Sequence, residues 1–305
     1  LSEPNTLPLD YCRYRIGDGE WSEPVPVLKA DALIRAEYGL EKRFGSNHQP
    51  WYLYATGVVD TAPRGECGVL WSFHVTQVPE NCHLALENPE DYTITVNGAA
   101  ISEVDGCWVD DDIETIDISG LLQEGDNEIE LSFTYRPNME IEDAYLVGDF
   151  GVKSLDGAAR PGSMTVIAQP GKLSEGSWVG QGLDTYGGAV RYRISVEGPT
   201  DGSRVRVSLP ELSCTAAVIH AGDEQFVLPW APFAADITDA LSEGVNDVWV
   251  EVIGGRHNIF GPLHTPWEGW TGPGEFDPDN PKWRFEYYLN DHGLMGPVVV
   301  ERVKL

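Results

Sequence analysis

The side chains best suited to ligand chemistry gather in one irregular segment, residues 254–291, which is rich in Pro and Gly. Flat indole faces can stack on the C–H surfaces of sugar rings, and histidine, asparagine and arginine can exchange hydrogen bonds with hydroxyl groups. Long ordered loops also tend to carry function. The candidate carbohydrate-binding residues are therefore the aromatic and polar side chains of this segment, together with one tryptophan from an earlier Pro-flanked turn: Trp230, His257, Asn258, His264, Trp267, Trp270 and Trp283.

A structural role is the alternative for these residues. Their aromatic rings could close the end of a folded domain or bury against another domain, and Trp230 lies just before an expected strand end at Asp236. His257 and His264 are seven residues apart, with no helix or strand register to direct both at one metal ion. Hydrogen-bonded loop histidines are thus favoured over metal ligands.

Acidic residues offer two further kinds of chemistry. The run Asp110, Asp111 and Asp112 presents hard oxygen ligands for a structural calcium ion, although such runs are more often solvated loops. No other cofactor is expected. Glycosidases use two carboxylates about 5 to 10 Å apart, but with 49 acidic residues in the chain no pair can be chosen from sequence, so no catalytic residue is assigned. The sequence contains no G-x-S-x-G, P-loop or H-E-x-x-H motif.

The elements that must position these residues are mainly strands. From about residue 50 onward, short runs of alternating apolar and polar residues are separated by Gly, Pro, Asn and Asp. Tyr92, Ile94 and Val96 share one face of such a run. Asn97-Gly98 then predicts a hairpin turn, because both residues tolerate positive φ.

The N-terminal segment differs from the rest. Residues 11–16 are strand-like and Gly17-Asp18-Gly19 supplies a turn, which predicts a short hairpin. Residues 30–38 combine good helix formers with Asp31 as a candidate N-cap and Gly39 as a stop, so a short connecting helix is expected.

An internal repeat organises the remainder of the chain. Asp117-Ile118-Ser119, Leu122, Gly125 and Asn127 recur as Asp236-Ile237-Thr238, Leu241, Gly244 and Asn246, always 119 residues later. The same offset aligns Trp71, Phe73 and Val75 with Val190, Tyr192 and Ile194. The pattern predicts a strand end, a leucine in the core, a turn with left-handed backbone and a new strand. Two copies of one domain are expected.

These motifs resemble the sugar-binding β-sandwich domains of family 2 glycoside hydrolases and of related rhamnosidase-like enzymes. The resemblance is carried by Val96-Asn97-Gly98 and by the pattern D-I-[ST]-x-x-L-x-x-G-x-N, which both copies contain. The second copy has His220-Ala221-Gly222 near the expected V-N-G, displaced from the common offset. Residues 182–188 and 260–264 look like segments that accompany these domains in the larger enzymes.

The resemblance implies an all-β fold of two tandem antiparallel β-sandwich (jelly-roll) domains with a short N-terminal hairpin and helix. The expected division is 1–50 for the hairpin and helix segment, 51–160 for the first sandwich and 161–305 for the second sandwich with its Trp-, His- and Pro-rich loop. Such domains flank a catalytic barrel, for which this chain has neither the residues nor the alternation of strands and helices. The catalytic domain of the parent chain is therefore an expected partner, together with carbohydrate.

Charge and composition restrict the remaining partners. The formal net charge of −29 would repel phosphate backbones and anionic lipid heads, so nucleic acid and membrane are not expected partners. The five cysteines, Cys12, Cys67, Cys82, Cys107 and Cys214, show neither paired nor zinc-like spacing and are expected to be free, mostly buried thiols. Together with the lack of a visible signal peptide, free thiols favour a cytoplasmic location over secretion.

The leading functional hypothesis is a non-catalytic, carbohydrate-associated accessory module pair of a large glycoside hydrolase, giving either sugar contact or support to the missing catalytic domain. A complete carbohydrate-active hydrolase with a site in residues 254–292 is one alternative, with Glu268 and Glu275 as carboxylates to test. A purely structural interaction scaffold is the other.

Overall fold

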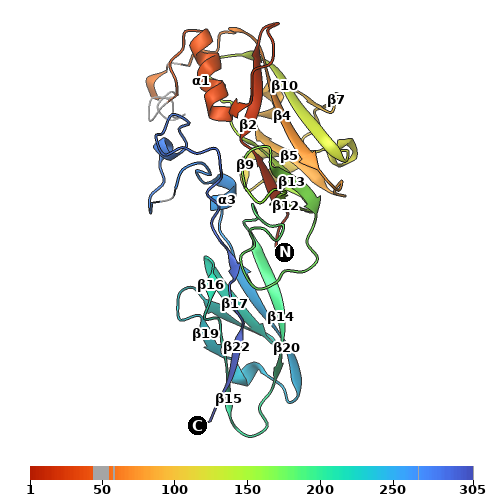
Figure 1. The fold of residues 1–305 in the computed structure, drawn as a ribbon, viewed down its shortest axis with the longest axis vertical. Coiled ribbons are helices and arrows are strands. Elements are labelled where there is room, and N and C mark those ends of the chain that lie inside the picture. Colours follow the sequence, from red (N-terminus) through yellow and green to blue (C-terminus); the bar gives the residue numbers. More distant parts are fainter. Residues whose placement is uncertain (44–54, 58, 267, 305) are drawn as a thin grey trace. The chain divides into compact units, whose positions relative to one another are not determined.

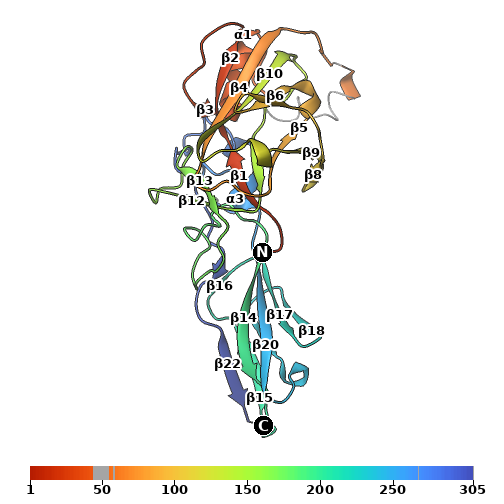
Figure 2. The ribbon, with the colours of Figure 1, turned by 90° about the vertical axis from the view of Figure 1, so that its right-hand side faces the viewer.

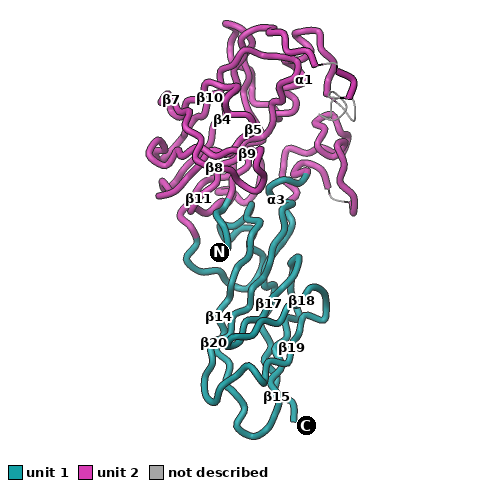
Figure 3. The backbone as a smooth tube through the Cα atoms, turned by 180° about the vertical axis from the view of Figure 1, so that it is seen from behind, with its two compact units in different colours: residues 1–5, 170–261, 289–305 teal, residues 6–169, 262–288 magenta. Residues whose placement is uncertain are grey.

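The structure, a computed structural model, describes residues 1–43, 55–57, 59–266 and 268–304. This part is built mainly of β-strands, and the chain forms two compact units (Figures 1 and 3). The first sandwich unit comprises residues 6–169 and 262–288, and the second comprises residues 1–5, 170–261 and 289–305. The predicted fold class, all-β with antiparallel sandwiches and a short N-terminal hairpin and helix, is confirmed.

Two sheets form the first sandwich unit. One has the strand order β1-β11-β5-β9-β8, and the other has the order β12-β13-β4-β10-β6-β7, with β2 pairing to β4 and β3 to β2. The bounds of the first sheet are β1 (Asn5–Leu9), β11 (Ala144–Gly148), β5 (Cys82–Glu87), β9 (Asp110–Asp117) and β8 (Gly106–Trp108). Those of the second are β12 (Phe150–Ser154), β13 (Met164–Ala168), β4 (Gly65–Val75), β10 (Gly125–Tyr135), β6 (Thr93–Val96), β7 (Ala99–Ile101), β2 (Tyr11–Ile16) and β3 (Val25–Pro26).

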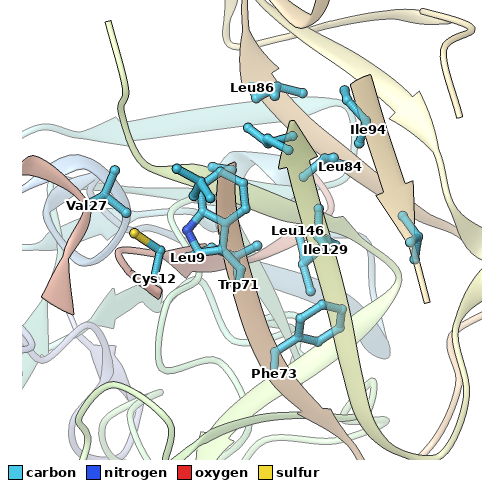
Figure 4. Packing of buried hydrophobic residues seen from close by; sticks show 14 of the residues in the cluster. Leu9, Cys12, Val27, Trp71, Phe73, Leu84, Leu86, Ile94, Ile129 and Leu146 are labelled. Carbon is cyan, nitrogen blue, oxygen red and sulfur yellow. The ribbon is translucent and has the colours of Figure 1, made fainter. Parts of the chain in front are cut away.

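The core of this unit lies along the long antiparallel pair β4 and β10. In β10 the alternate residues Ile129, Leu131, Phe133 and Tyr135 are buried, as the period of a half-buried strand requires. Trp71 of β4 lies opposite Ile129 and is 1% exposed. Figure 4 shows its indole beside Leu9 and Cys12, so the N-terminal strands complete this core.

The second sandwich unit repeats the long pair with β14 and β20. Its main sheet has the order β14-β20-β17-β18, facing smaller sheets of order β19-β15-β22 and β16-β21. The bounds are β14 (Ala189–Glu197), β20 (Val245–Ile253), β17 (Ala216–Ala221), β18 (Glu224–Leu228), β19 (Ala234–Asp236), β15 (Arg204–Ser208), β22 (Val299–Val303), β16 (Leu212–Ser213) and β21 (Gly293–Leu294). Trp178, which donates from Nε1 to the Tyr192 hydroxyl at 2.7 Å, is the largest side chain in its core.

The repeated motif forms the same hydrogen bonds in both units. Asn127 accepts from the Gln123 N–H and donates to the Gln123 and Gly125 carbonyls, and Asn246 does the same with Ser242 and Gly244. The glycines have φ of +97° and +88°, as predicted for a left-handed turn. In the adjacent segments, the Asp117 and Asp236 carboxylates accept from Ser119 and Thr238, which begin the 3₁₀ turns η3 (Ser119–Leu121) and η4 (Thr238–Ala240).

The upstream alignment of the two copies at an offset of 119 is wrong by four residues. Phe73 pairs with Asn127, but the residue that pairs with Asn246 is Val196, which lies 123 residues after Phe73. Because the shift is even, the same face of the strand still points inward, and alternation alone cannot detect it.

The hairpin predicted at Asn97-Gly98 is confirmed. Val96 pairs with Ala99 around Asn97 and Gly98, whose φ values are +49° and +80°. The displaced His220-Ala221-Gly222 also forms a hairpin, because β17 and β18 pair around Gly222 with φ of +54°. A Cβ at Gly222 would lie 2.9 Å from the Ala240 carbonyl oxygen, so the position requires glycine.

In the N-terminal segment the hairpin of β2 and β3 is confirmed, whereas one detail of the helix is wrong. Helix α1 (Val27–Glu37) begins after Pro26, so Asp31 is a buried mid-helix residue and not the N-cap. Gly39, with φ of +70°, follows the helix end as predicted. The other short helices are α3 (His257–Phe260), η2 (Pro89–Asp91) and η5 (Pro273–Glu275).

The compact units differ from the three contiguous ranges expected from the sequence. The segment before residue 50 contributes β1 and β2 to the sheets of the first sandwich. Residues 262–288 also belong to the first unit, although they were assigned to the second domain. Strand pairing and the contacts of His264 and Tyr287 with Asp10, described below, explain both differences.

All five cysteines lie in the described part, where each is a free thiol; Cys12, Cys67 and Cys82 are buried, Cys107 is exposed and Cys214 is intermediate. Among the described helices, none has the length and apolar character needed to span a membrane.

The buried Asp31 should make stability depend on pH. Burial raises the pKa of its carboxyl to about 6, against the opposing charges of Arg43 and Arg35. Between about pH 4 and pH 6 the folded state binds a proton that the unfolded state has released, so this group lowers the free energy of unfolding as the pH rises through that window. Between pH 4 and pH 7, the free energy of unfolding of Asp31→Asn should therefore rise by up to about 3 kcal/mol relative to that of the native protein.

Urea unfolding of both proteins across this pH range measures the difference, with Glu37→Gln on the exposed side of α1 as the control. The same pH dependence in native protein and Asp31→Asn would refute the assignment.

The two turn asparagines should differ in importance. Asn127 is 0% exposed and also accepts from Asn97, whereas Asn246 is only partly buried. Because unsatisfied buried groups cost more than exposed ones, Asn127→Ala should destabilise its unit by about 2 to 3 kcal/mol and Asn246→Ala by about 1 kcal/mol. Thermal unfolding of the two variants measures both losses of stability. A larger destabilisation by Asn246→Ala than by Asn127→Ala would contradict the prediction.

Candidate functional site

The seven candidate carbohydrate-binding residues divide between the units. Trp230, His257 and Asn258 belong to the second sandwich unit, and His264, Trp270 and Trp283 belong to the first. Trp267 lies outside the described residues. The segment 254–292 is therefore divided between the units, with residues 262–288 in the first and residues 254–261 and 289–292 in the second.

His264 and Trp283 are brought together in a buried network, here called the clasp, formed by Asp10, His264, Trp283 and Tyr287. The His264 ring stacks on Trp283, with 4.4 Å between centroids, and is 4% exposed. Its Nδ1 lies 2.7 Å from the Arg284 carbonyl oxygen, and its Nε2 lies 2.8 Å from Asp10 Oδ2. The Tyr287 hydroxyl donates to Asp10 Oδ1 at 2.7 Å. The clasp thus attaches residues 262–288 to strand β1's end, and His264 is used in packing.

A second carboxyl lies near the clasp. Burial, together with the negative charges of Asp10 and Glu142, raises the pKa of Asp143 well above its ordinary value. A carboxyl with a strongly raised pKa is a candidate functional group where it lies at a cleft. However, the pocket that Asp10 and Tyr287 line has a volume of only about 40 Å³, which is close to the share of one water molecule and much smaller than a ligand pocket.

Asn258 joins two segments of the second unit. Its Nδ2 donates to the carbonyls of Asp184 and Asn290 at 2.9 and 3.0 Å, and its Oδ1 accepts from the Asn290 N–H at 2.8 Å. The residue is 2% exposed. The amide of Asn258 is therefore occupied in holding the segments around Asp184 and Asn290 together. His257, the first residue of α3, is partly buried.

The two remaining tryptophans are open to solvent. Trp230 is 75% exposed and Trp270 is 69% exposed. The Trp270 ring lies over Gly272, where a Cβ would come within 2.2 Å of it. Both indoles keep surface on which a ligand could stack, but they belong to different units.

The loop carboxylates are engaged in local interactions. Glu268 pairs with Lys282 at 2.5 Å on the surface, and Glu275 Oε2 accepts from the Gly272 N–H at 2.9 Å. Asp279 pairs with Lys29 and Lys42, and hydrogen bonds from these lysines lower its pKa. These contacts order the loop 262–288.

The described residues contain no group of three or more His, Cys, Asp or Glu side chains placed to hold a metal ion. Asp110, Asp111 and Asp112 are exposed at the start of β9, where the Asp112 N–H donates to Asp110 Oδ1. Burial and the charges of Glu142, Asp112 and Asp110 raise the pKa of Glu87.

A larger pocket of about 390 Å³ lies at the open edge of the first sandwich. Ile94 and Ile101, from β6 and β7, face Ile116 of β9 across its apolar part. Polar atoms come from Glu114 of β9 and from the exposed Glu90 and Ser102. We call it the edge pocket, and its lining is Pro89, Glu90, Tyr92, Ile94, Ile101, Ser102, Val104, Glu114 and Ile116.

The wall of the edge pocket is fixed by hydrogen bonding and aromatic packing. The Tyr92 hydroxyl donates to the Glu140 carbonyl at 3.0 Å, and its ring packs edge-on against Phe133. Burial raises the pKa of Tyr92, so the hydroxyl remains protonated at neutral pH. No local sequence pattern indicates this pocket, because its residues have the types of ordinary strand and loop positions and meet only when distant strands pair.

Comparison with known proteins gives matches to structures only. No protein-family model matches the sequence, and no curated protein matches it significantly. Among solved structures, a rhamnosidase from Novosphingobium sp. PP1Y is 16% identical, with a TM-score of 0.30, over 79% of this chain and 22% of that one. A β-D-mannosidase from Dictyoglomus thermophilum is 15% identical, with a TM-score of 0.32, over 88% of this chain and 33% of that one.

An α-L-rhamnosidase from Streptomyces avermitilis, solved with L-rhamnose, is 14% identical, with a TM-score of 0.28, over 80% of this chain and 26% of that one. The chain thus spans between a fifth and a third of the length of these three enzymes.

Disrupting the clasp should release residues 262–288. Asp10→Ala removes the hydrogen-bond partner of both the Tyr287 hydroxyl and His264 Nε2, and leaving these groups unsatisfied costs about 2 to 5 kcal/mol. Limited proteolysis should then cut this segment at least tenfold faster. The exposed pair of Lys282 with Glu268 provides the control, since Lys282→Ala should cost under about 1 kcal/mol. Equal cleavage rates in both variants would contradict the role of the clasp.

Proposed function

We propose that this chain is a non-catalytic, carbohydrate-associated accessory part of a larger glycoside hydrolase, and that the edge pocket of its first sandwich binds a saccharide. The catalytic domain and the carbohydrate are its proposed partners. The net charge of −29 disfavours nucleic acid and anionic membrane surfaces.

The observation that carries this proposal is the edge pocket itself. Its volume of about 390 Å³ lies within the range of small-molecule sites. The partly exposed Ile101 and the exposed Val104 offer apolar contact to the C–H faces of a sugar ring, above the buried Ile94 and Ile116, while Glu90, Ser102 and Glu114 offer acceptors for hydroxyl groups. Carboxylates without a lysine or arginine among the lining residues favour a neutral sugar over an acidic one.

The positions of the acidic groups favour a non-catalytic role over a complete hydrolase. The pKa of Asp143 is raised near Asp10, but the pocket that Asp10 lines has a volume of only about 40 Å³, which leaves no space for a sugar ring. Glu268 and Glu275 of the loop are paired with Lys282 and with the Gly272 N–H.

Support of another domain is the second candidate, and the clasp favours it. Residues 262–288 use His264 and Trp283 for packing within the first unit, which orders a long loop whose Trp270 remains exposed. Such an ordered loop would suit contact with a further domain of the parent protein.

The binding proposal is tested by isothermal titration with neutral gluco-, manno-, galacto- and xylo-oligosaccharides, alongside a chromogenic-glycoside assay. Glu114→Gln should weaken binding about 10- to 100-fold, because it removes a charge-assisted acceptor. Ile101→Trp should abolish binding at the edge pocket by filling it. Glu128→Gln, the same substitution as at Glu114 but at an exposed position of β10, is the control and should bind as the native chain does.

Turnover of a chromogenic glycoside that is lost in Glu268→Gln or Glu275→Gln would instead establish a complete hydrolase. Absence of both binding and turnover would leave the supporting role.

A further inference from the structure

The outward face of the main sheet in the second sandwich carries an exposed indole. Figure 2 shows β14, β20, β17 and β18 side by side, in the order given by their pairing. Val248, Val250 and Val252 of β20 point into the core and are 0% exposed. Trp249 alternates with them and is 41% exposed, so its ring lies on the solvent face.

The register places polar side chains on both sides of this indole. Trp249 is opposite Arg193 of β14 and opposite His220 of β17, and His220 is in turn opposite Gln225 of β18. Directly paired residues share a face of the sheet, and neighbouring strands are about 4.8 Å apart. The row Arg193, Trp249, His220 and Gln225 therefore spans about 14 Å across the strands. A flat aromatic surface is flanked by hydrogen-bonding groups on either side.

These polar groups are held in place by ion pairs. Arg193 binds both Asp247 carboxylate oxygens, at 3.0 and 2.6 Å. Glu251 Oε2 accepts from Arg191 Nε at 2.9 Å and lies 2.7 Å from His220 Nε2. Although burial raises the pKa of Glu251, these contacts hold it below its ordinary value. Side chains that are already ordered lose less conformational entropy when a ligand binds.

The charges of the ion pairs beside Trp249 cancel. Arg191 and Arg193 contribute two positive charges, and Asp247 and Glu251 contribute two negative charges. Each arginine has five N–H donors and uses one or two of them in these pairs, which leaves donors for hydroxyl groups. The arrangement suits a polar ligand without charge that also has an apolar face.

The first sandwich does not share this feature. The residue in the corresponding place of the repeat, 119 positions earlier, is Glu130, which pairs with Arg15. Folding of the sandwich therefore does not require a tryptophan at this position.

We propose that the face formed by Arg191, Arg193, His220, Gln225, Trp249 and Glu251 is a second saccharide-binding site, on which a neutral oligosaccharide lies across the strands with one ring stacked on Trp249. This inference deepens the proposed function and depends on it. The site lies in the other sandwich unit from the edge pocket, so the two can be tested separately.

The test uses the full chain carrying Ile101→Trp, in which the edge pocket is filled, so that only the second site can bind. In ¹H–¹⁵N spectra the indole N–H signal of Trp249 is identified by its absence from Trp249→Phe. Titration with neutral gluco-, manno-, galacto- and xylo-hexaoses should shift this signal for at least one of them. Oligogalacturonate, as an acidic probe, should bind at least tenfold more weakly than that neutral sugar.

Substitutions then separate stacking from folding. Trp249→Ala should weaken binding at least tenfold, whereas Trp249→Phe, which keeps a flat ring, should stay within about threefold. Val300→Ala changes an exposed side chain of β22 in the same unit and should have no effect on binding, whereas Trp230→Ala tests the other exposed indole of this unit. Thermal unfolding confirms that each variant is folded.

Several outcomes overturn the inference. If the native chain binds a saccharide but the Ile101→Trp chain does not, the second site fails while the proposed function stands. If the native chain binds no saccharide, both fail. Loss of binding in Trp230→Ala but not in Trp249→Ala relocates the site. A dimer in analytical ultracentrifugation that dissociates in Trp249→Ala would show that a second copy covers this face.

Discussion

The fold depends on one constraint in each sandwich: a long antiparallel strand pair whose inward side chains must be buried, with a Gly-x-Asn turn where the second strand of the pair begins. Asn127 and Asn246 satisfy the same backbone groups around Gly125 and Gly244, in the left-handed conformation that glycine permits. A register slip of one residue would place the buried valines and isoleucines in solvent. The asparagine amide and the alternation of the strands therefore act together.

The same constraint determines where functional surfaces can form. Inward positions are committed to the core, so ligand contacts are left to sheet edges, outward faces and loops. In the first sandwich the hairpin of β6 and β7 diverges from β9, and the space between them is the edge pocket. In the second sandwich the outward face carries Trp249 among paired charges. The aromatic-rich loop is divided, because the clasp commits His264 and Trp283 to packing.

Much of the fold could be predicted from local patterns. The hairpin at Asn97-Gly98, the turns at Gly125 and Gly244 and the helix stop at Gly39 follow from residues that tolerate positive φ. The four-residue shift between the copies could not be predicted, because strands alternate with a period of two. Aspartate is a residue type that often caps helices, which is why Asp31 was a candidate N-cap. However, α1 begins at Val27 after a proline, and tertiary packing buries the Asp31 carboxyl. The clasp joins Asp10 to residues more than 250 positions away, and no local signal indicates that contact.

The central claim is that the chain binds carbohydrate without hydrolysing it, and NMR titration of the full chain with neutral oligosaccharides tests both halves in one sample. The account predicts saturable shifts of the Ile101 and Glu114 backbone amides, with the oligosaccharide signals unchanged over days. New reducing-end signals would show hydrolysis and contradict the non-catalytic assignment. Spectra that do not change with any saccharide would contradict binding.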